Sequence, residues 1–252
     1  MTVNTEPEAL LSHLQNADGS ATFSYAGYIV VGAVNGPIEV QRRDELPEEA
    51  AVDVIVRPAA GVGGTRERHL ESLLQSTLRQ IILVNNFPRT LIQVILQVTT
   101  APENEYVNAK VVQASSNLPI LPALLQTAVL ALLSAALPLT ATLTSTSLAI
   151  IADGQSKKIV INPSPREIQI SESFHVFSFT STDELILVES EGNFTVKEWN
   201  DAFVAAQQQC CSSDVTNDGD TLMDDDNPTG ANLKQFIRST MEEKIASDLH
   251  WK

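Results

Sequence analysis

The feature of this sequence that most restricts its fold is a long stretch without charged side chains, which lies between Lys110 and Asp153. Within it residues 118–139 are largely apolar, and a transmembrane helix needs about 20 such residues. However, Pro122 and Pro138 bracket a shorter helix, polar residues interrupt it, and no basic flank is present to orient it in a bilayer. We therefore predict a central helix buried in the core of a globular protein, and no membrane partner.

The charge of the chain limits the partners that it can bind. Its formal net charge of −15 at pH 7 argues against indiscriminate nucleic-acid binding, because phosphate contacts require Lys and Arg. Six aspartates lie within residues 214–226, so the remaining surface is less acidic and can still present a basic rim. Hydrophobic residues make up 43% of the chain but aromatic residues only 5%, which indicates a core of aliphatic side chains.

The cysteines and histidines give no sign of a disulfide framework or a metal site. Cys210 and Cys211 are adjacent, and neighbouring residues rarely reach disulfide geometry with each other. With no secretory signal after Met1, we expect an intracellular protein. No pair of histidines has metal-ligand spacing, so a zinc site is not expected. The four histidines are His13, His69, His175 and His250. We interpret His175, in a predicted strand, as a core or interface residue.

Apolar periodicity divides the chain into strands and helices. Extended structure is predicted over residues 22–40, 51–57, 91–98, 143–151, 157–161, 168–180 and 184–189. Helices are predicted over residues 65–84, between Pro122 and Pro138, and over residues 196–209 and 232–249. Thr65 is expected to cap the first of these helices, with Glu67 in its first turn. This order of elements predicts one α+β domain with mixed sheets.

Four short motifs in the first part of the chain resemble those of a known family. They are Asp18-Gly19-Ser20, Gly36-Pro37-Ile38-Glu39, Arg57-Pro58 and Gly64-Thr65-Arg66-Glu67. In this order and spacing they resemble the N-terminal half of the RNase PH family, the fold of phosphorolytic 3′-to-5′ exoribonucleases. The resemblance implies a single RNase PH-like domain (ribosomal protein S5 domain 2-like), in which mixed sheets pack against helices.

The resemblance also divides the chain. Residues 1–17 are expected to be a short N-terminal extension, and residues 18–209 to form the domain, with an inserted loop near 102–118. Residues 210–231 are rich in Asp, Ser and Asn and have little to bury, so we expect a flexible acidic insertion. Residues 232–252 are expected to supply the last helix of the domain.

The phosphate site of active family members has no counterpart at the corresponding position. Those members hold inorganic phosphate with a loop containing Gly, Ser or Thr, and Arg at the start of the central helix, where N–H groups are available. Residues 118–122 read Leu-Pro-Ile-Leu-Pro, with no cation, no hydroxyl and two prolines that cannot donate. Residues 63–66 (Gly-Gly-Thr-Arg) also look like a phosphate cradle, but they precede a different helix.

The metal site is altered as well. The family's run is Asp-Leu-x-x-x-Glu-Asp, and this chain has Asn162 and Ile168 at the two aspartate positions. Glu167 alone remains, although a hard divalent cation prefers carboxylate oxygens. We therefore predict no catalytic residue, no bound metal and no cofactor.

What the resemblance implies is a non-catalytic ring subunit of the eukaryotic RNA exosome. Its expected partners are the other RNase PH-like subunits of a six-membered ring, RNA-binding cap subunits, and RNA threaded through the channel. Its expected location is the nucleus and nucleolus, and also the cytoplasm. Two alternatives stay open: an active phosphate-dependent exoribonuclease with an unusual site, and a different inactive subunit of the same ring.

Direct RNA contacts are predicted for Arg42, Arg43, Arg66 and Arg68, because the corresponding surfaces in the family lie close to the RNA path. Two other interpretations stay open. Arg42 and Arg43 could balance the acidic residues that follow them, and Arg66 could be an ordinary surface arginine at the start of a helix.

Overall fold

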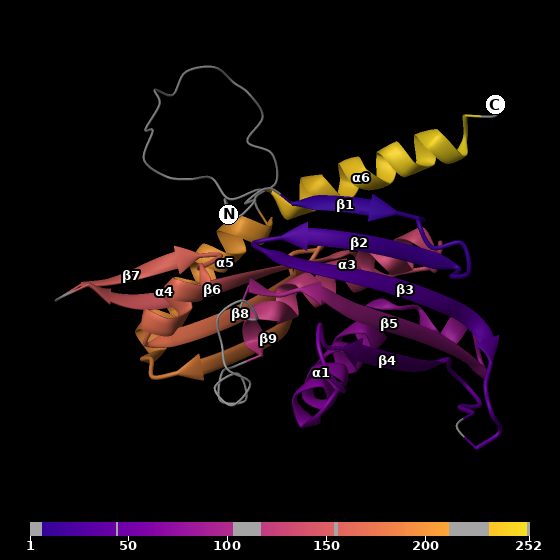
Figure 1. The fold of residues 1–252 in the computed structure, drawn as a ribbon, viewed down its shortest axis with the longest axis horizontal. Coiled ribbons are helices and arrows are strands. Elements are labelled where there is room, and N and C mark those ends of the chain that lie inside the picture. Colours follow the sequence, from indigo (N-terminus) through magenta and orange to yellow (C-terminus); the bar gives the residue numbers. More distant parts are fainter. Residues whose placement is uncertain (1–6, 44, 103–116, 154–155, 212–231, 251–252) are drawn as a thin grey trace.

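The computed structural model describes residues 7–43, 45–102, 117–153, 156–211 and 232–250, which form two sheets with helices packed on them (Figure 1). The first sheet has the strand order β1-β2-β3-β5-β4 and the second the order β7-β6-β8-β9. The strands of the first sheet are β1 (Glu8–Leu11), β2 (Gly19–Tyr25), β3 (Tyr28–Glu39), β4 (Ala51–Arg57) and β5 (Thr90–Thr100). Those of the second are β6 (Leu143–Asp153), β7 (Ser156–Ile161), β8 (Ser173–Thr180) and β9 (Leu185–Gly192).

The first sheet is mixed because β4 and β5 pair in parallel, whereas its other pairs are antiparallel. The crossover between these two strands contains α1 (Thr65–Ile81) and the short 3-10 helix η1 (Val84–Asn86). The second sheet is antiparallel throughout its described pairs. These observations confirm the predicted α+β fold, with the mixed character confined to the first sheet.

The extended structure predicted over residues 22–40 belongs to two strands. Tyr25 pairs with Tyr28, so β2 and β3 form a hairpin whose two turn residues are Ala26 and Gly27. Both have positive φ, 51° and 83°, as a tight turn that follows the twist of the strands requires. The turn presents Tyr25 toward the second half of the chain.

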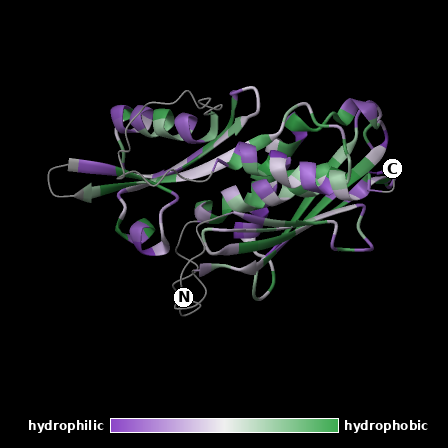
Figure 2. Ribbon diagram, turned by 90° about the horizontal axis from the view of Figure 1, so that it is seen from above, coloured by the Kyte–Doolittle hydropathy of each residue, from purple (hydrophilic) through white to green (hydrophobic). Residues whose placement is uncertain are grey.

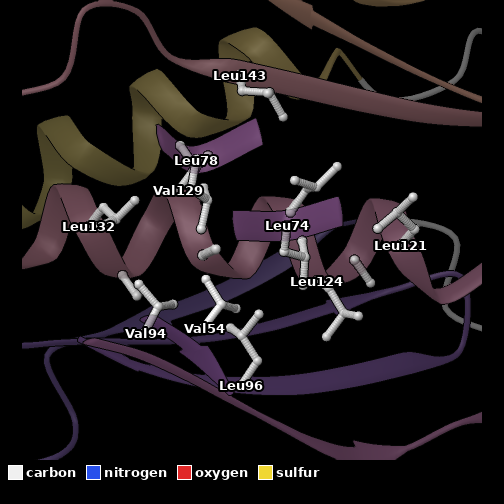
Figure 3. Packing of buried hydrophobic residues seen from close by; sticks show 14 of the residues in the cluster. Val54, Leu74, Leu78, Val94, Leu96, Leu121, Leu124, Val129, Leu132 and Leu143 are labelled. Carbon is white, nitrogen blue, oxygen red and sulfur yellow. The ribbon is translucent and has the colours of Figure 1, made fainter. Parts of the chain in front are cut away.

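Residues 121–134 of the uncharged stretch form the central helix, as predicted. After the 3-10 helix η3 (Leu118–Ile120), α3 (Leu121–Ser134) is buried at every position except Leu133, which is half-buried. It packs against both sheets, and Figure 3 shows Leu124, Val129 and Leu132 among side chains of the first sheet and α1. Pro122 is the second residue of this helix, and the helix ends before Ala136, which has a φ of 55°. No helix in the described part of the chain is long and apolar enough to cross a membrane.

The central helix comes unusually close to the first sheet at Gly19. A Cβ atom at this position would lie 2.4 Å from the carbonyl oxygen of Ala131 and 2.4 Å from the amide nitrogen of Ala135. The Gly of the Asp-Gly-Ser motif therefore allows β2 to cross the last turn of α3 without a side chain between them.

Helix α1 covers the outer edge of β4. Gly64 precedes its first residue, so the N-cap lies one residue before the predicted Thr65. Glu67 lies in the first turn as predicted, and its Oε2 accepts a hydrogen bond of 2.6 Å from the Gly64 N–H. Further along, Glu71 Oε1 accepts from the Val56 N–H at 2.9 Å, and Gln75 Nε2 donates to the Val52 carbonyl at 2.7 Å.

The strand predicted over residues 168–180 is wrong in its first part. Residues Pro165–Ile170 form a short helix, α4, and β8 begins only at Ser173. Ser164 is the N-cap, and Glu167 reaches back to its backbone N–H. This Ser-x-x-Glu capping box, with proline at the first helical position, favours a helix over a strand.

The outer helices complete the molecule. Helix α5 (Val196–Cys211) packs on β6 and β8 around a second apolar cluster that contains Phe177, Phe179 and Ala206. Helix α6 (Leu233–Asp248) begins after Asn232, whose side chain accepts from the Gln235 N–H. The outer helices show hydrophilic and hydrophobic residues in alternation in Figure 2, as expected for helices with one face on the core.

Parts of the predicted division of the chain lie outside the described residues. These are residues 1–6, residues 103–116 of the predicted inserted loop, and residues 212–231 of the predicted acidic insertion. Within the predicted N-terminal extension, residues 8–11 form β1, which pairs with β2 at the edge of the first sheet.

Candidate active-site region

The structure brings together the two segments in which this sequence departs from active enzymes of the family. Pro119 and Pro122, at the start of the central helix, line the same small cavity as Asn162 and Ile168. Tyr25, from the β2–β3 hairpin, lines its third side. The two segments that the family resemblance assigns to phosphate and to metal therefore lie together in this fold.

This cavity is too small for a reactant. Its volume is about 20 Å³, which is room for about one water molecule. Leu118, Pro119, Leu121 and Pro122 are buried, so the start of the helix presents apolar groups where an anion would need donors. The space between these residues is smaller than a phosphate ion.

Asn162 is held by protein contacts on both atoms of its amide. Its Nδ2 donates to Tyr25 Oη at 2.7 Å, and its Oδ1 accepts from Thr146 Oγ1 at 3.5 Å. Its backbone has a φ of 51°, and its N–H donates to the Ser147 carbonyl at 2.8 Å. Asparagine tolerates this left-handed conformation better than most residues. The side chain thus links the two sheets through its short bond to Tyr25, whereas the contact of its oxygen with Thr146 is long.

Tyr25 is suited to this contact because it stays neutral. Burial raises the pKa of its phenol, and the hydrogen bond from Asn162 offsets only part of that effect. The phenol oxygen therefore accepts the hydrogen bond from Asn162 as an uncharged group.

Glu167, the carboxylate that remains of the family's metal motif, is turned away from the cavity. Its Oε2 accepts hydrogen bonds from the Ser164 N–H at 2.7 Å and the Ser164 Oγ at 2.8 Å. Neither Asp nor Glu is found among the described residues that line the cavity. In the described ranges no three His, Cys, Asp or Glu side chains gather closely enough to hold a metal ion.

The four predicted RNA-contacting arginines fall into two pairs at opposite ends of the first sheet. Arg42 and Arg43 follow the end of β3, beside the start of β4, whereas Arg66 and Arg68 follow the other end of β4. Because β4 spans seven residues, the two pairs are separated by about 20 Å or more. The structure therefore does not gather them into one basic patch.

Arg66 is the arginine of this set that lies beside the altered site. It lines an open pocket of about 570 Å³ between the start of α1 and the end of β5. Tyr28 lines both this pocket and the small cavity, which makes the two neighbours. Arg68 forms an ion pair of 3.2 Å with Glu71. One backbone donor of the cradle-like residues 63–66 is already used within the protein, because the Gly64 N–H donates to Glu67.

Other groups with catalytic potential do not line this cavity; His175 and Cys210 are buried, and Cys211 is half-buried. His175 is fully buried, with Nδ1 2.9 Å from Ser190 Oγ and Nε2 3.1 Å from Ser173 Oγ. Burial lowers its pKa, which favours the neutral imidazole, in line with the predicted core role. Burial also raises the pKa of Cys210 to about 12 and that of Cys211 to about 11. Neither thiol is a nucleophile near neutral pH.

Sequence reasoning did not identify Tyr25 and Thr146 as partners of Asn162. Tyr25 lies 137 residues away in the chain, and no local pattern reports a contact of this kind. By contrast, the spacing of Ser164 and Glu167 was a readable signal for the helix cap that removes Glu167 from the site.

Comparisons with known proteins agree with this fold. Residues 8–138 match the 3′ exoribonuclease family, domain 1, and residues 143–209 match domain 2 of the same family. The chain is 31% identical over 209 residues to the exosome complex component RRP46 of Saccharomyces cerevisiae, which covers 81% of this chain and 89% of that protein. It is 41% identical over 85 residues to the exosome complex component rrp46 of Schizosaccharomyces pombe. This alignment covers 34% of this chain and 38% of that protein.

Solved structures show the same architecture. The crystal structure of rice (Oryza sativa) Rrp46 aligns with a TM-score of 0.71 at 22% identity, covering 94% of this chain and 95% of that one. A chain of an archaeal exosome core aligns with a TM-score of 0.61 at 15% identity, covering 81% and 83% of the two chains. At these identities the likeness is one of fold.

Proposed function

Because this chain belongs to the 3′ exoribonuclease (RNase PH) family, we propose that it is a non-catalytic ring subunit of the RNA exosome. Its work is to help form the channel through which RNA passes for 3′-to-5′ processing and degradation. The observation that carries this proposal is the lining of the site: two prolines, Ile168 and Asn162, whose amide bonds to Tyr25, line a cavity of about 20 Å³.

The chemistry of the family explains why this observation matters. Phosphorolysis requires a phosphate ion held against the last phosphodiester and positive charge to stabilise the transition state. The start of α3 offers no donor side chain for the phosphate, and Glu167 caps α4 in place of binding a cation. Loss of both functions at one place favours a scaffold over an enzyme with an unusual site.

The partners and location follow from the similarity to exosome components. We propose that the chain occupies the RRP46 position in a six-membered ring of RNase PH-like subunits, next to RNA-binding cap subunits. Similarity to the yeast RRP46 component over 89% of that protein supports this position over that of another inactive ring subunit. The proposed location is the nucleus and nucleolus, and also the cytoplasm.

A phosphorolysis assay tests the proposal directly. The purified chain is mixed with labelled single-stranded RNA, magnesium and inorganic phosphate, and release of nucleoside diphosphates is measured. The same chain is then combined with candidate ring subunits and sized by light scattering. We expect no release, together with co-elution in a ring-sized complex. Phosphate-dependent release from the chain alone, abolished by Arg66→Ala, would show that the site works with residues to which we give a structural role.

The arginines supply a second test, on RNA binding. We propose that Arg66 and Arg68 contact the RNA backbone beside the pocket, and that Arg42 and Arg43 contact it at the other end of the sheet. In the assembled ring, Arg66→Ala combined with Arg68→Ala is expected to weaken RNA binding severalfold. The slope of log affinity against log salt should fall by about 0.7 for each phosphate group that the variant no longer neutralises.

The control for this test is Arg238→Ala on α6, an exposed arginine whose described partner is Glu242 on the same helix. It removes a positive charge from a surface that we do not assign to RNA. An equal loss of affinity for each positive charge removed, in the control and in the double variant, would mean that only net charge matters, and would contradict the assignment.

A further inference from the structure

The two sheets end in edges of different kinds. At the edge of the first sheet, side chains of α1 form hydrogen bonds with the backbone groups of β4 that point outward. The Val56 N–H donates to Glu71, and Gln75 donates to the Val52 carbonyl. At the corresponding edge of the second sheet, β9 receives no such side chain from any described residue. Figure 1 shows β9 as the outermost strand of the second sheet. An eight-residue strand of this kind is a template for another strand.

The register of β8 and β9 identifies which backbone groups face outward. The Asn193 N–H donates to the Glu172 carbonyl at 3.0 Å, and the pairing continues through Phe174 with Glu191. In an antiparallel pair, hydrogen-bonded and non-hydrogen-bonded positions alternate. The backbone groups of Glu189 and Glu191 therefore bond to β8. The N–H and C=O groups of Val188 and Ser190, which alternate with them along the strand, point away from β8.

The side chains of β9 restrict what can be added. Glu191 is exposed and Glu189 is half-buried, and neither forms an ion pair with a described residue. An added strand that carries Lys or Arg beside them gains favourable cross-strand pairs. A second copy of this chain does not meet this requirement. β9 itself carries no Lys or Arg, so no register of two β9 strands supplies these pairs, and in an antiparallel register centred on Ser190 Glu189 of one copy would stand opposite Glu191 of the other.

We propose that β9 is a docking edge, to which a neighbouring ring subunit adds an extended strand with basic side chains. The inference rests on the proposed function, because it takes the neighbour to be another subunit of the ring. Backbone hydrogen bonds to Val188 and Ser190 would supply affinity, and pairing with Glu189 and Glu191 would select a basic partner strand over a second copy of this chain.

Amide hydrogen exchange, measured at single residues, tests the added strand. The probes are the chain alone and the complex reconstituted with its ring subunits. We expect the amides of Val188 and Ser190 to exchange at least about tenfold more slowly in the complex than in the chain alone. The amides of Glu189 and Glu191, already bonded to β8, should be protected in both states.

Charge reversal tests the choice of partner. Glu189→Lys combined with Glu191→Lys is expected to weaken association with the ring subunits at least about tenfold. The control, Glu242→Lys combined with Glu243→Lys on the exposed face of α6, should leave association unchanged. Unchanged exchange of the β8 amides in each variant verifies that the second sheet is intact.

The outcomes separate this inference from the proposed function. A ring that forms while Val188 and Ser190 still exchange rapidly overturns the docking edge alone. Slow exchange of these two amides in a self-associated chain overturns the basic partner in favour of a second copy. Failure to form any complex with the ring subunits overturns the proposed function and the docking edge together.

Discussion

Replacement of Gly19 by alanine is expected to lower the free energy of unfolding by about 2–3 kcal/mol, although it adds only one methyl group. That methyl carbon would lie 2.4 Å from the Ala131 carbonyl oxygen and 2.6 Å from Ala135 Cβ. Both neighbours belong to the end of the central helix or the residue that follows it, so neither can rotate away. The helix or β2 has to move, and both lie in a close-packed core.

The matched control for this prediction is Gly63→Ala. A Cβ atom at Gly63 would find its nearest neighbour, the Val56 carbonyl oxygen, at 3.7 Å, which is an ordinary contact. Chemical denaturation of the two variants and the parent chain, followed by circular dichroism, measures the difference. A Gly19 variant as stable as the Gly63 variant would show that β2 and α3 are not in this close contact.

Replacement of Phe177 by alanine is expected to cost about 3–5 kcal/mol of stability, the largest effect that we predict. Phe177 is fully buried at the centre of the second apolar cluster. Its ring centroid lies 5.8 Å from that of Trp199 and 6.0 Å from that of Phe203, both on α5. Removal of the ring leaves a cavity between α5 and the second sheet, and removes aromatic contacts in addition to buried area.

Val204→Ala on the same helix is the control for Phe177→Ala, because Val204 is half exposed and removal of two methyl groups there should cost less than about 0.5 kcal/mol. Thermal unfolding followed by Trp fluorescence reports on the site directly, since Trp199 contacts Phe177. A small effect of Phe177→Ala would mean that α5 contributes little to the stability of the domain.

Some elements of the fold could be predicted because their signals are local. The absence of charge between Lys110 and Asp153 predicts the buried central helix, and the alternation over residues 51–57 predicts β4. The strand expected from Ile168 was wrong because the apolar residues of α4 were counted as part of β8, although the Ser164 cap favours a helix there. The turn at Ala26 was missed because alanine rarely adopts positive φ, so no turn residue precedes Gly27.

At the candidate site, the residue types could be predicted from the sequence, whereas the tertiary contacts could not. The sequence shows that residues 118–122 have no side chain that can donate a hydrogen bond. It also shows that Asn162 and Ile168 stand at the two aspartate positions of the family. The hydrogen bond from Asn162 to Tyr25 cannot be seen in the sequence, because it depends on the contact between the β2–β3 hairpin and the loop after β7. The size of the cavity has the same origin, since three separate segments enclose it.

The position of α3 has a consequence for how the molecule unfolds. The family divides the chain into residues 8–138 and 143–209, yet this helix, from the first part, packs against strands of both sheets. Neither part can lose its structure without uncovering apolar surface of the other. The stabilities of the two parts are therefore coupled through α3, and we expect a local defect at Gly19 to be felt by the second sheet.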